Sequence, residues 1–219
     1  MKEDRELLSK YFPEQAVEAV YTSLKEKNVQ LRISRSRSTK LGDYRPGMNG
    51  KPHRISINHD LNIFEFLITY VHELAHLYTF EKFGRRHQPH GKEWKQFFVQ
   101  LMIPFLNNGV FPAEIQQELQ VHLLDAKAAN GSDLDLKRIL QKYNHKQNLT
   151  ATSVESLSEN SYFKLPDGRV FQRLELRRKR YKCLCMNNKR LYLFSPLAMV
   201  EVCDRFEPNQ FLHLLKKLG

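Results

Sequence analysis

Hydrophobic side chains recur at helical spacing along five segments of the chain. Side chains three and four positions apart lie on one face of an α-helix, so this spacing predicts amphipathic helices. One segment, 62–83, is apolar around most of its circumference, which is typical of a helix that is buried on almost every side. The predicted helices cover 13–27, 62–83, a segment that begins near residue 91, one that begins at Pro112, and a short one over 132–143.

Alternating apolar and β-branched residues predict short strands between and after these helices. Two strands, 31–37 and 53–58, lie on either side of a segment rich in glycine and proline, 42–52, which predicts a loop or hairpin turn. The C-terminal part lacks helical spacing and predicts four strands, over 161–165, 169–176, 179–185 and 190–194. The fold class is therefore α+β: a helical domain with a short sheet, followed by a small β-rich module.

A polar segment separates the two parts. Residues 144–160 are rich in Ser, Thr and Asn, a composition typical of a linker. We therefore expect a domain over 1–143, a polar linker over 144–160, and a small basic β-hairpin module over 161–219.

The strongest candidate for chemistry is the sequence His72-Glu73-Leu74-Ala75-His76 in the longest predicted helix. Residues four positions apart lie about one turn apart on one helix face, so both imidazoles can bind one zinc ion. Glu73 then lies where a carboxylate can accept a proton from the water that the metal activates. The pattern predicts a catalytic zinc site.

The polar stripe on this helix has two interpretations, a solvent-exposed face or the wall of an internal cleft. A stripe that faces bulk solvent normally contains Lys, Arg and Glu, whereas His and Thr predominate here. We therefore favour the cleft with a metal. The stripe consists of Glu65, Thr69, His72, His76 and Thr79.

Two histidines do not complete a catalytic zinc site, which usually has three protein ligands and an open position. Three later residues offer a donor atom, namely His87, His90 and Glu93. The metzincin subclass has its third histidine six residues after the second, and it is excluded because that residue is Lys82. His90 is favoured because Gly91 permits a tight turn there and because it lies four residues before Trp94 on the next predicted helix.

These features together resemble the SprT-like zinc metallopeptidase family. The resemblance rests on the motif at 72–76, on His90-Gly91-x-x-Trp94-Lys95 after a gap of 13 residues, and on two upstream segments. Those segments are 34–44, a basic strand with a Leu-Gly pair, and the isoleucine-containing strand 53–58. The resemblance covers roughly residues 10–105, and by motif position it assigns His72, His76 and His90 as zinc ligands and Glu73 as the general base.

The resemblance implies a zincin-like fold, one catalytic Zn²⁺ ion and proteolysis, and its best-known members, the Spartan proteases, act on proteins bound to DNA. We expect a substrate peptide to lie extended against an exposed strand edge, which we place at residues 55–58. The hydroxyl groups of Tyr44 and Tyr78 are two unranked candidates for stabilising the oxyanion of the reaction.

SprT-like proteins often end in a zinc ribbon, and the C-terminal module resembles a degenerate one. Cys183-Leu184-Cys185 is similar to the first knuckle of such a ribbon, but a second Cys-x-x-Cys is missing. Cys203 and His213 would bring the ligands to four, but their spacing does not fit a ribbon. We expect the three cysteines to be reduced and to pack as small hydrophobic side chains.

Charge adds a second candidate function. The chain has 35 Lys and Arg against 24 Asp and Glu, a formal net charge of +11. Residues 161–190 contain ten basic against two acidic residues, whereas 191–219 are balanced. A basic run is either a solvated face or a surface that contacts phosphates. The candidate nucleic-acid contacts are Arg173, Arg177, Arg178, Lys179, Arg180, Lys182 and Lys189.

Composition also indicates a compartment. Three cysteines are too few for a disulfide framework, and residues 1–6 are too charged for a secretory signal. Without an apolar run of about 18 residues we expect no membrane span, and hence a cytoplasmic protein.

The function that these features predict is a zinc-dependent SprT-like endopeptidase whose substrates are proteins or peptides, including those associated with nucleic acid. A non-proteolytic nucleic-acid-binding or regulatory protein that keeps the zinc-binding fold is the alternative, with DNA or a nucleoprotein as its partner. A zinc hydrolase that acts on a non-peptide amide also fits the predicted site. The oligomeric state does not follow from the sequence.

Overall fold

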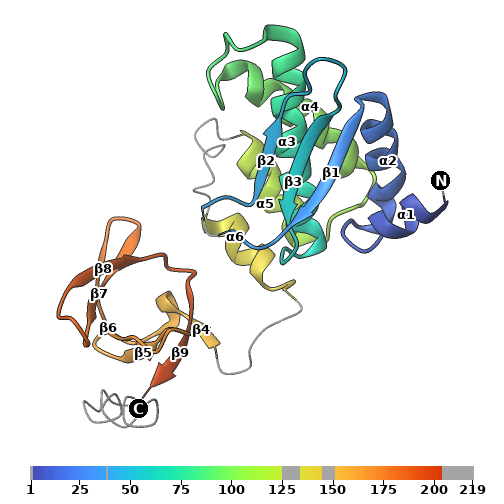
Figure 1. Cartoon of the computed structure of the whole chain (residues 1–219). Coiled ribbons are helices and arrows are strands. Elements are labelled where there is room, and N and C mark those ends of the chain that lie inside the picture. Colours follow the sequence, from blue (N-terminus) through green and yellow to red (C-terminus); the bar gives the residue numbers. More distant parts are fainter. Residues whose placement is uncertain (1, 38, 125–133, 145–150, 204–219) are drawn as a thin grey trace, which may run out of the picture. The chain divides into compact units, whose positions relative to one another are not determined.

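The computed structural model describes residues 2–37, 39–124, 134–144 and 151–203. The chain divides into two units, Met1–His145 and Lys146–Gly219. The first combines helices with a short sheet and the second is a β-sheet unit, which confirms the α+β class (Figure 1). The elements of the first unit are α1 (Lys2–Leu8), η1 (Glu14–Ala16), α2 (Val17–Glu26), β1 (Val29–Ser34), β2 (Gly42–Arg45), β3 (His53–Asn58), α3 (Ile63–Phe83), α4 (Lys92–Asn107), α5 (Ala113–Leu124) and α6 (Leu134–Gln141).

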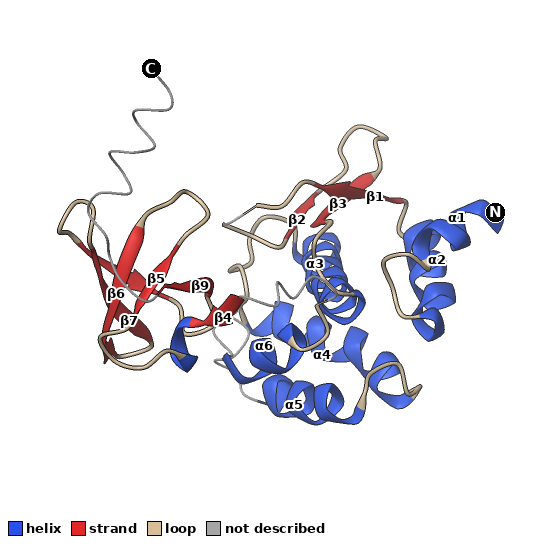
Figure 2. Ribbon diagram, turned by 90° about the horizontal axis from the view of Figure 1, so that it is seen from below, coloured by secondary structure: helices blue, strands red, loops and turns tan. Residues whose placement is uncertain are grey.

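The sheet of the first unit has the strand order β1-β3-β2. The central strand β3 pairs parallel with β1 and antiparallel with β2. Its Ile55 and Ile57 are fully buried, since α3 packs against the sheet, and α4 and α5 lie on the side of α3 away from the sheet (Figure 2). The sheet therefore has two edges, and the one formed by β2 lies next to α3.

Two expectations for this sheet are wrong. Residues 42–45 were expected in a loop, but they form β2, because Gly42 allows the strand to approach α3 closely. Residues 55–58 were expected at an exposed edge, but they lie in the central strand, where both sides of the backbone are paired.

The long helix α3 is fixed at its start by one side chain. Asn62 is the N-cap, and its Oδ1 accepts hydrogen bonds from the backbone N–H groups of Phe64 and Glu65 at 3.1 and 2.9 Å. Its Nδ2 donates to the carbonyl oxygen of Leu140 and to Oδ1 of Asn144, both at 2.9 Å. The same buried residue thus begins α3 and holds the end of α6 against it.

The second unit is a six-stranded antiparallel sheet with the order β4-β9-β5-β6-β7-β8. Its small core is built around the stacked rings of Phe163 and Phe171, 5.5 Å apart. The four predicted strands are present, and two further strands and a short helix join them. The elements are β4 (Ala151–Ser153), η3 (Val154–Ser156), β5 (Tyr162–Lys164), β6 (Val170–Arg177), β7 (Arg180–Cys185), β8 (Leu191–Phe194) and β9 (Met199–Cys203).

The linker expected over 144–160 needs correction for its second half. Residues 151–153 form β4, which pairs with β9, and Val154 is fully buried in the core of the second unit. The polar composition of this segment concealed the strand, because its pairing partner lies more than 40 residues further along the chain.

No helix in the described part of the chain is long and apolar enough to cross a membrane.

Candidate metal centre

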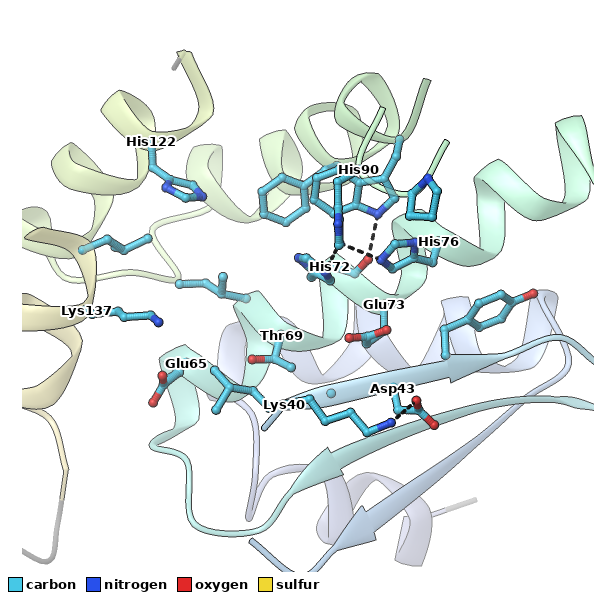
Figure 3. A pocket seen from close by; sticks show the side chains of 18 of the residues that line it. Lys40, Asp43, Glu65, Thr69, His72, Glu73, His76, His90, His122 and Lys137 are labelled. Atoms are coloured by element: carbon cyan, nitrogen blue, oxygen red, sulfur yellow. Dashed lines mark hydrogen bonds and ion pairs between the residues drawn. The ribbon is translucent and has the colours of Figure 1, made fainter. Parts of the chain in front are cut away.

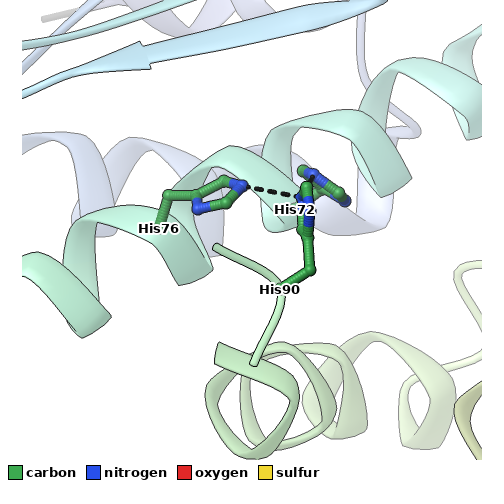
Figure 4. Close-up of side chains that lie close together, drawn as sticks. All are labelled: His72, His76 and His90. Atoms are coloured by element: carbon green, nitrogen blue, oxygen red, sulfur yellow. Dashed lines mark hydrogen bonds between the residues drawn. The ribbon is translucent and has the colours of Figure 1, made fainter. Parts of the chain in front are cut away.

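Three histidine side chains converge at one point of the first unit. His72 and His76 lie on α3, and His90 lies just before α4. The Nε2 atom of His90 is 3.0 Å from that of His72 and 3.1 Å from that of His76 (Figure 4). Among the described residues, these three form the one group of at least three His, Cys, Asp or Glu side chains whose ligand atoms lie within 4.8 Å of one another.

The turn before α4 brings His90 to the other two histidines. His90 has a φ of 57°, in the left-handed region, so the chain reverses direction at this residue. Gly91 follows as the N-cap of α4, and its N–H donates to the carbonyl oxygen of Gln88 at 2.9 Å. A Cβ atom at Gly91 would lie 2.9 Å from that oxygen, which explains why a glycine follows the histidine.

Trp94 forms the floor beneath the three imidazoles. Its ring is fully buried, and its centroid lies 4.6, 5.3 and 4.8 Å from those of His72, His76 and His90. The indole N–H donates to the carbonyl oxygen of His72 at 3.3 Å. The ring of Phe98 stacks on the indole, with the two centroids 5.0 Å apart. Side chains packed in this way restrict the rotation of the histidines.

The electrostatics of the cluster favour neutral imidazoles. Burial, with smaller contributions from the neighbouring histidines, lowers the pKa of His72 to about 3 and that of His76 to about 4. Burial, followed by the charge of Lys95, also lowers the pKa of His90. A neutral imidazole is the form that binds a metal.

The cluster passes a simple geometric test for a metal. Zinc binds histidine nitrogens at about 2.0–2.1 Å in tetrahedral geometry, which requires ligand nitrogens about 3.3 Å apart. The two short Nε2–Nε2 separations, 3.0 and 3.1 Å, are close to this value. The three residues therefore fit a tetrahedral metal ion with one position left for a ligand.

Glu73 lies between α3 and β2, beside the three histidines (Figure 3). Only 7% of it is exposed, and burial, then the charge of Asp43, raises the pKa of Glu73 to about 7. A backbone hydrogen bond from Tyr44 opposes this rise. Gly42 of β2 leaves room for the carboxylate, because a Cβ there would lie 2.6 Å from its Oε1.

The triad and Glu73 line a cavity of about 650 Å³. Gly42, Asp43 and Tyr44 of β2 line one side of it, so an edge that no other described strand pairs with borders the candidate site. Residues of α5 and α6 line the opposite side. None of the latter was predicted to lie near the site, because the sequence gives no sign of where two short amphipathic helices pack.

The other candidates for a third ligand do not join the cluster. His87 lines the cavity, but its Nδ1 donates to the carbonyl oxygen of Gly84 at 2.7 Å. Glu93 belongs neither to the cluster of possible ligands nor to the cavity wall.

The two tyrosines considered for the oxyanion have other roles. The hydroxyl of Tyr44 donates to Nδ1 of His53 at 2.9 Å, an atom that also accepts the N–H of Gly47. Tyr78 packs against Phe97 and beneath the ammonium group of Lys27, away from the cavity. Neither hydroxyl is directed at the metal centre.

Residues 8–116 match the SprT-like family. The N-terminal unit of the chain belongs to the SprT-like family. No curated protein and no solved structure matches the chain. Family membership and the histidine cluster together indicate a metal-binding domain of the metallopeptidase type, a class of hydrolases. The match includes all four residues of the candidate site and ends within α5 of the SprT-like domain.

Two of the three cysteines of the second unit lie in its core, and Cys203 is partly exposed. Cys183 and Cys185 are fully buried beside Phe163 and Phe171. Burial raises the pKa of Cys183 to about 11, so its thiol stays protonated and is a poor metal ligand. No disulfide joins the three cysteines, all of which belong to the described part of the chain, whereas His213 lies outside it.

The seven basic candidates for nucleic-acid contact do not form one surface. Four of them, which we call the basic hairpin tip, surround the exposed turn between β6 and β7: Arg177, Arg178, Lys179 and Arg180. Lys189 lies in the turn at the opposite end of β7. Lys182 forms an ion pair with Glu175 at 2.6 Å, and Arg173 lies half-buried, 4.2 Å above the ring of Tyr181.

Proposed function

We propose that the SprT-like domain is a zinc-dependent endopeptidase. The observation that carries this proposal is the convergence of three neutral imidazoles beside a buried carboxyl, Glu73, on the wall of an open cavity. Three ligands and an open position are typical of catalytic rather than structural zinc sites. The matched family supports the peptidase class.

The chain supplies most of the proposed chemistry through Glu73. Zinc held by the three imidazoles would polarise the peptide carbonyl and acidify the attacking water. Glu73 accepts the proton of that water and returns it to the leaving amine, so that the C–N bond breaks and a carboxylic acid and an amine form. A carboxyl group with a pKa near neutrality suits both transfers.

The free edge of β2 supports an extended substrate. Among the described residues this strand pairs with β3 alone, and three of its residues line the cavity. A peptide that adds to such an edge is held by backbone hydrogen bonds, which do not depend on its sequence. We therefore place the substrate along β2 rather than along β3.

Metal analysis and proteolysis test this proposal together. We expect the purified full-length chain to contain about one zinc ion and to cleave an unfolded protein such as casein. A chelator should abolish cleavage, and added zinc should restore it. Fluorescence should report the same cycle, because the single tryptophan of the chain, Trp94, lies against the triad. Cleavage that persists without metal, or a chain that binds no zinc, would overturn the proposal.

Gly42→Ala tests how Glu73 is positioned. The new Cβ would lie 2.6 Å from Oε1 of Glu73 and 2.8 Å from Cγ2 of Thr69, so the carboxylate must move. A displacement of about 1 Å costs on the order of 100-fold in rate. We expect kcat to fall by about that factor while zinc content stays at one per chain.

Gly50→Ala is the control for this substitution, because a Cβ there meets no atom within 4 Å. Its positive φ of 77° costs about 1 kcal/mol of stability, but we expect kcat to be unchanged. If both variants retained full activity, the close packing of β2 on Glu73 would be irrelevant to catalysis.

We propose nucleic-acid binding by the basic hairpin tip as a second function. The side chains of this tip are exposed, and within the described residues none of the four has an ion-pair partner. Arg177 and Arg180 are directly paired across the two strands, and like charges in that position destabilise a hairpin. A phosphate backbone would relieve this repulsion and release counterions.

The double variant Arg177→Gln/Arg180→Gln tests the second function. Each phosphate contact contributes about 0.7 to the slope of log affinity against log salt for single strands. We expect the slope for single-stranded DNA to decrease by about 1.4 in the full-length protein. Lys164→Gln/Arg169→Gln is the matched control, since both cations already pair with carboxylates, Glu201 and Asp167. Equal slopes for the two variants would exclude the tip as a phosphate contact.

A further inference from the structure

The cavity continues beyond the metal centre into a region that the family match covers only in part. There it is lined by Ile68 of α3, Phe98 of α4, His122 of α5, and Leu136 and Leu140 of α6, which we call the distal pocket. His122, Leu136 and Leu140 follow residue 116, where the match ends. Residues that lie beyond the matched segment therefore complete the distal pocket.

The ring of Phe98 connects the distal pocket with the metal centre. The centroid of the Phe98 ring lies 6.0 Å from that of His72 and 6.4 Å from that of His122, edge to face in both cases. Figure 3 shows His122 across the cavity from Glu73. A peptide whose carbonyl lay at the triad would place a neighbouring side chain within reach of this pocket.

The outer wall of the distal pocket is firmly held. Leu136 and Leu140 are 5% and 4% exposed, and they lie one turn apart on α6. The end of α6 is bound to Asn62, which donates to the carbonyl oxygen of Leu140. Glu114 of α5 accepts hydrogen bonds from Lys142 and Tyr143 at 2.7 and 2.8 Å. A wall fixed by these contacts can discriminate between side chains by size.

The charges near the distal pocket offset each other. Glu65 and Lys137 also line the cavity at this end and carry opposite charges (Figure 3). Burial raises the pKa of Glu65, and the ammonium group of Lys137 opposes this rise. The apolar side chains, rather than a net charge, therefore decide what enters.

We propose that the distal pocket binds a bulky apolar side chain of the substrate, such as Leu, Met or Phe, next to the bond that is cleaved. The inference rests on the proposed peptidase function and assigns its selectivity. Ile68, on the catalytic helix and only partly buried, is the specificity-determining residue, because a larger side chain there would extend into the cavity.

The selectivity is measured with peptides that differ only in one residue beside the cleaved bond. We expect the wild-type chain to prefer Leu over Ala by about 10- to 100-fold in kcat/KM, the range that apolar pockets achieve. Ile68→Phe should remove most of this preference, whereas the matched change Ile103→Phe on α4, at a 45% exposed site outside the cavity, should leave it unchanged. Equal ratios in wild type and Ile68→Phe would overturn the proposal.

The variant Glu65→Gln tests whether the distal pocket selects substrate side chains by their size or by their charge. If the pocket selects apolar groups, this variant keeps the preference for Leu. A wild-type preference for Lys or Arg that disappears in Glu65→Gln would instead show a charge-selective pocket and overturn the proposal.

Equilibrium binding distinguishes failure of the pocket from failure of the peptidase. The Glu73→Gln chain, loaded with zinc, should bind the Leu peptide about 10-fold or more tightly than the Ala peptide, as followed by Trp94 fluorescence, and Ile68→Phe should abolish the difference. Binding with this dependence in a chain that cleaves nothing would refute the peptidase but retain the pocket. Cleavage without any side-chain preference would retain the peptidase and refute the pocket.

Discussion

Glu73→Gln is expected to lower kcat/KM for peptide cleavage by about 1,000-fold while the chain still binds one zinc ion. Glutamine has the shape of glutamate, and its carbonyl oxygen can still accept the backbone hydrogen bond from Tyr44. It does not take up a proton at neutral pH, so the attacking water loses its base. General acid–base catalysis contributes about 10²–10⁴ in rate, which sets the expected size of the loss.

Glu81→Gln is the matched control, because it makes the same change on the same helix. Glu81 forms an ion pair with Lys27 at 2.7 Å and does not line the cavity. We expect its activity to remain within about twofold of wild type, since exposed ion pairs contribute only up to about 1 kcal/mol to stability. If Glu73→Gln kept a tenth or more of the activity, another group would have to carry the proton.

His90→Ala is expected to weaken zinc binding by on the order of 100-fold or more. Four-ligand zinc sites bind with about 10–16 kcal/mol, so that one ligand accounts for about 3 kcal/mol. The measurement is a competition titration followed by Trp94 fluorescence, since the indole lies 4.8 Å from the imidazole of His90. Activity at limiting zinc should fall with occupancy.

Two companion variants show whether the loss of zinc affinity is due to the imidazole of His90. His90→Asn also removes the imidazole, but asparagine tolerates the left-handed backbone at this position, so a loss of zinc in both variants is not a folding defect. His87→Ala removes a histidine that lines the same cavity outside the triad, and it should bind zinc normally. A chain that lost zinc with His87→Ala and kept it with His90→Ala would have a different third ligand.

The sequence predicted the local parts of the site well. The i, i+4 spacing of His72 and His76 places both on one helix face wherever that helix packs, and α3 begins and ends within one residue of the predicted bounds. The stripe of His and Thr correctly indicated a cleft. For His90, however, the pattern indicated only a preference among three candidates, because the position of this residue depends on a turn with a φ of 57° that follows the helix by several residues.

Pairing between distant strands was predicted poorly. Segment 42–45 reads as a loop because glycine and proline surround it, yet it becomes a strand by pairing with β3. Residues 151–153 read as a linker, yet they pair with β9. The energy of a strand comes from cross-strand neighbours and burial, and these are not encoded locally.

The sequence alone therefore placed two histidines and a glutamate on one buried helix and indicated a candidate third ligand nearby. Only the tertiary structure showed that β2 rather than β3 borders the cavity and that α6 lines its far end. It also showed that four of the seven basic candidates lie at one hairpin tip. The physical reason is the distance along the chain over which each interaction acts. Helical spacing acts within a few residues, whereas a strand edge, a cavity wall and a charged surface arise only when segments far apart in the chain come together.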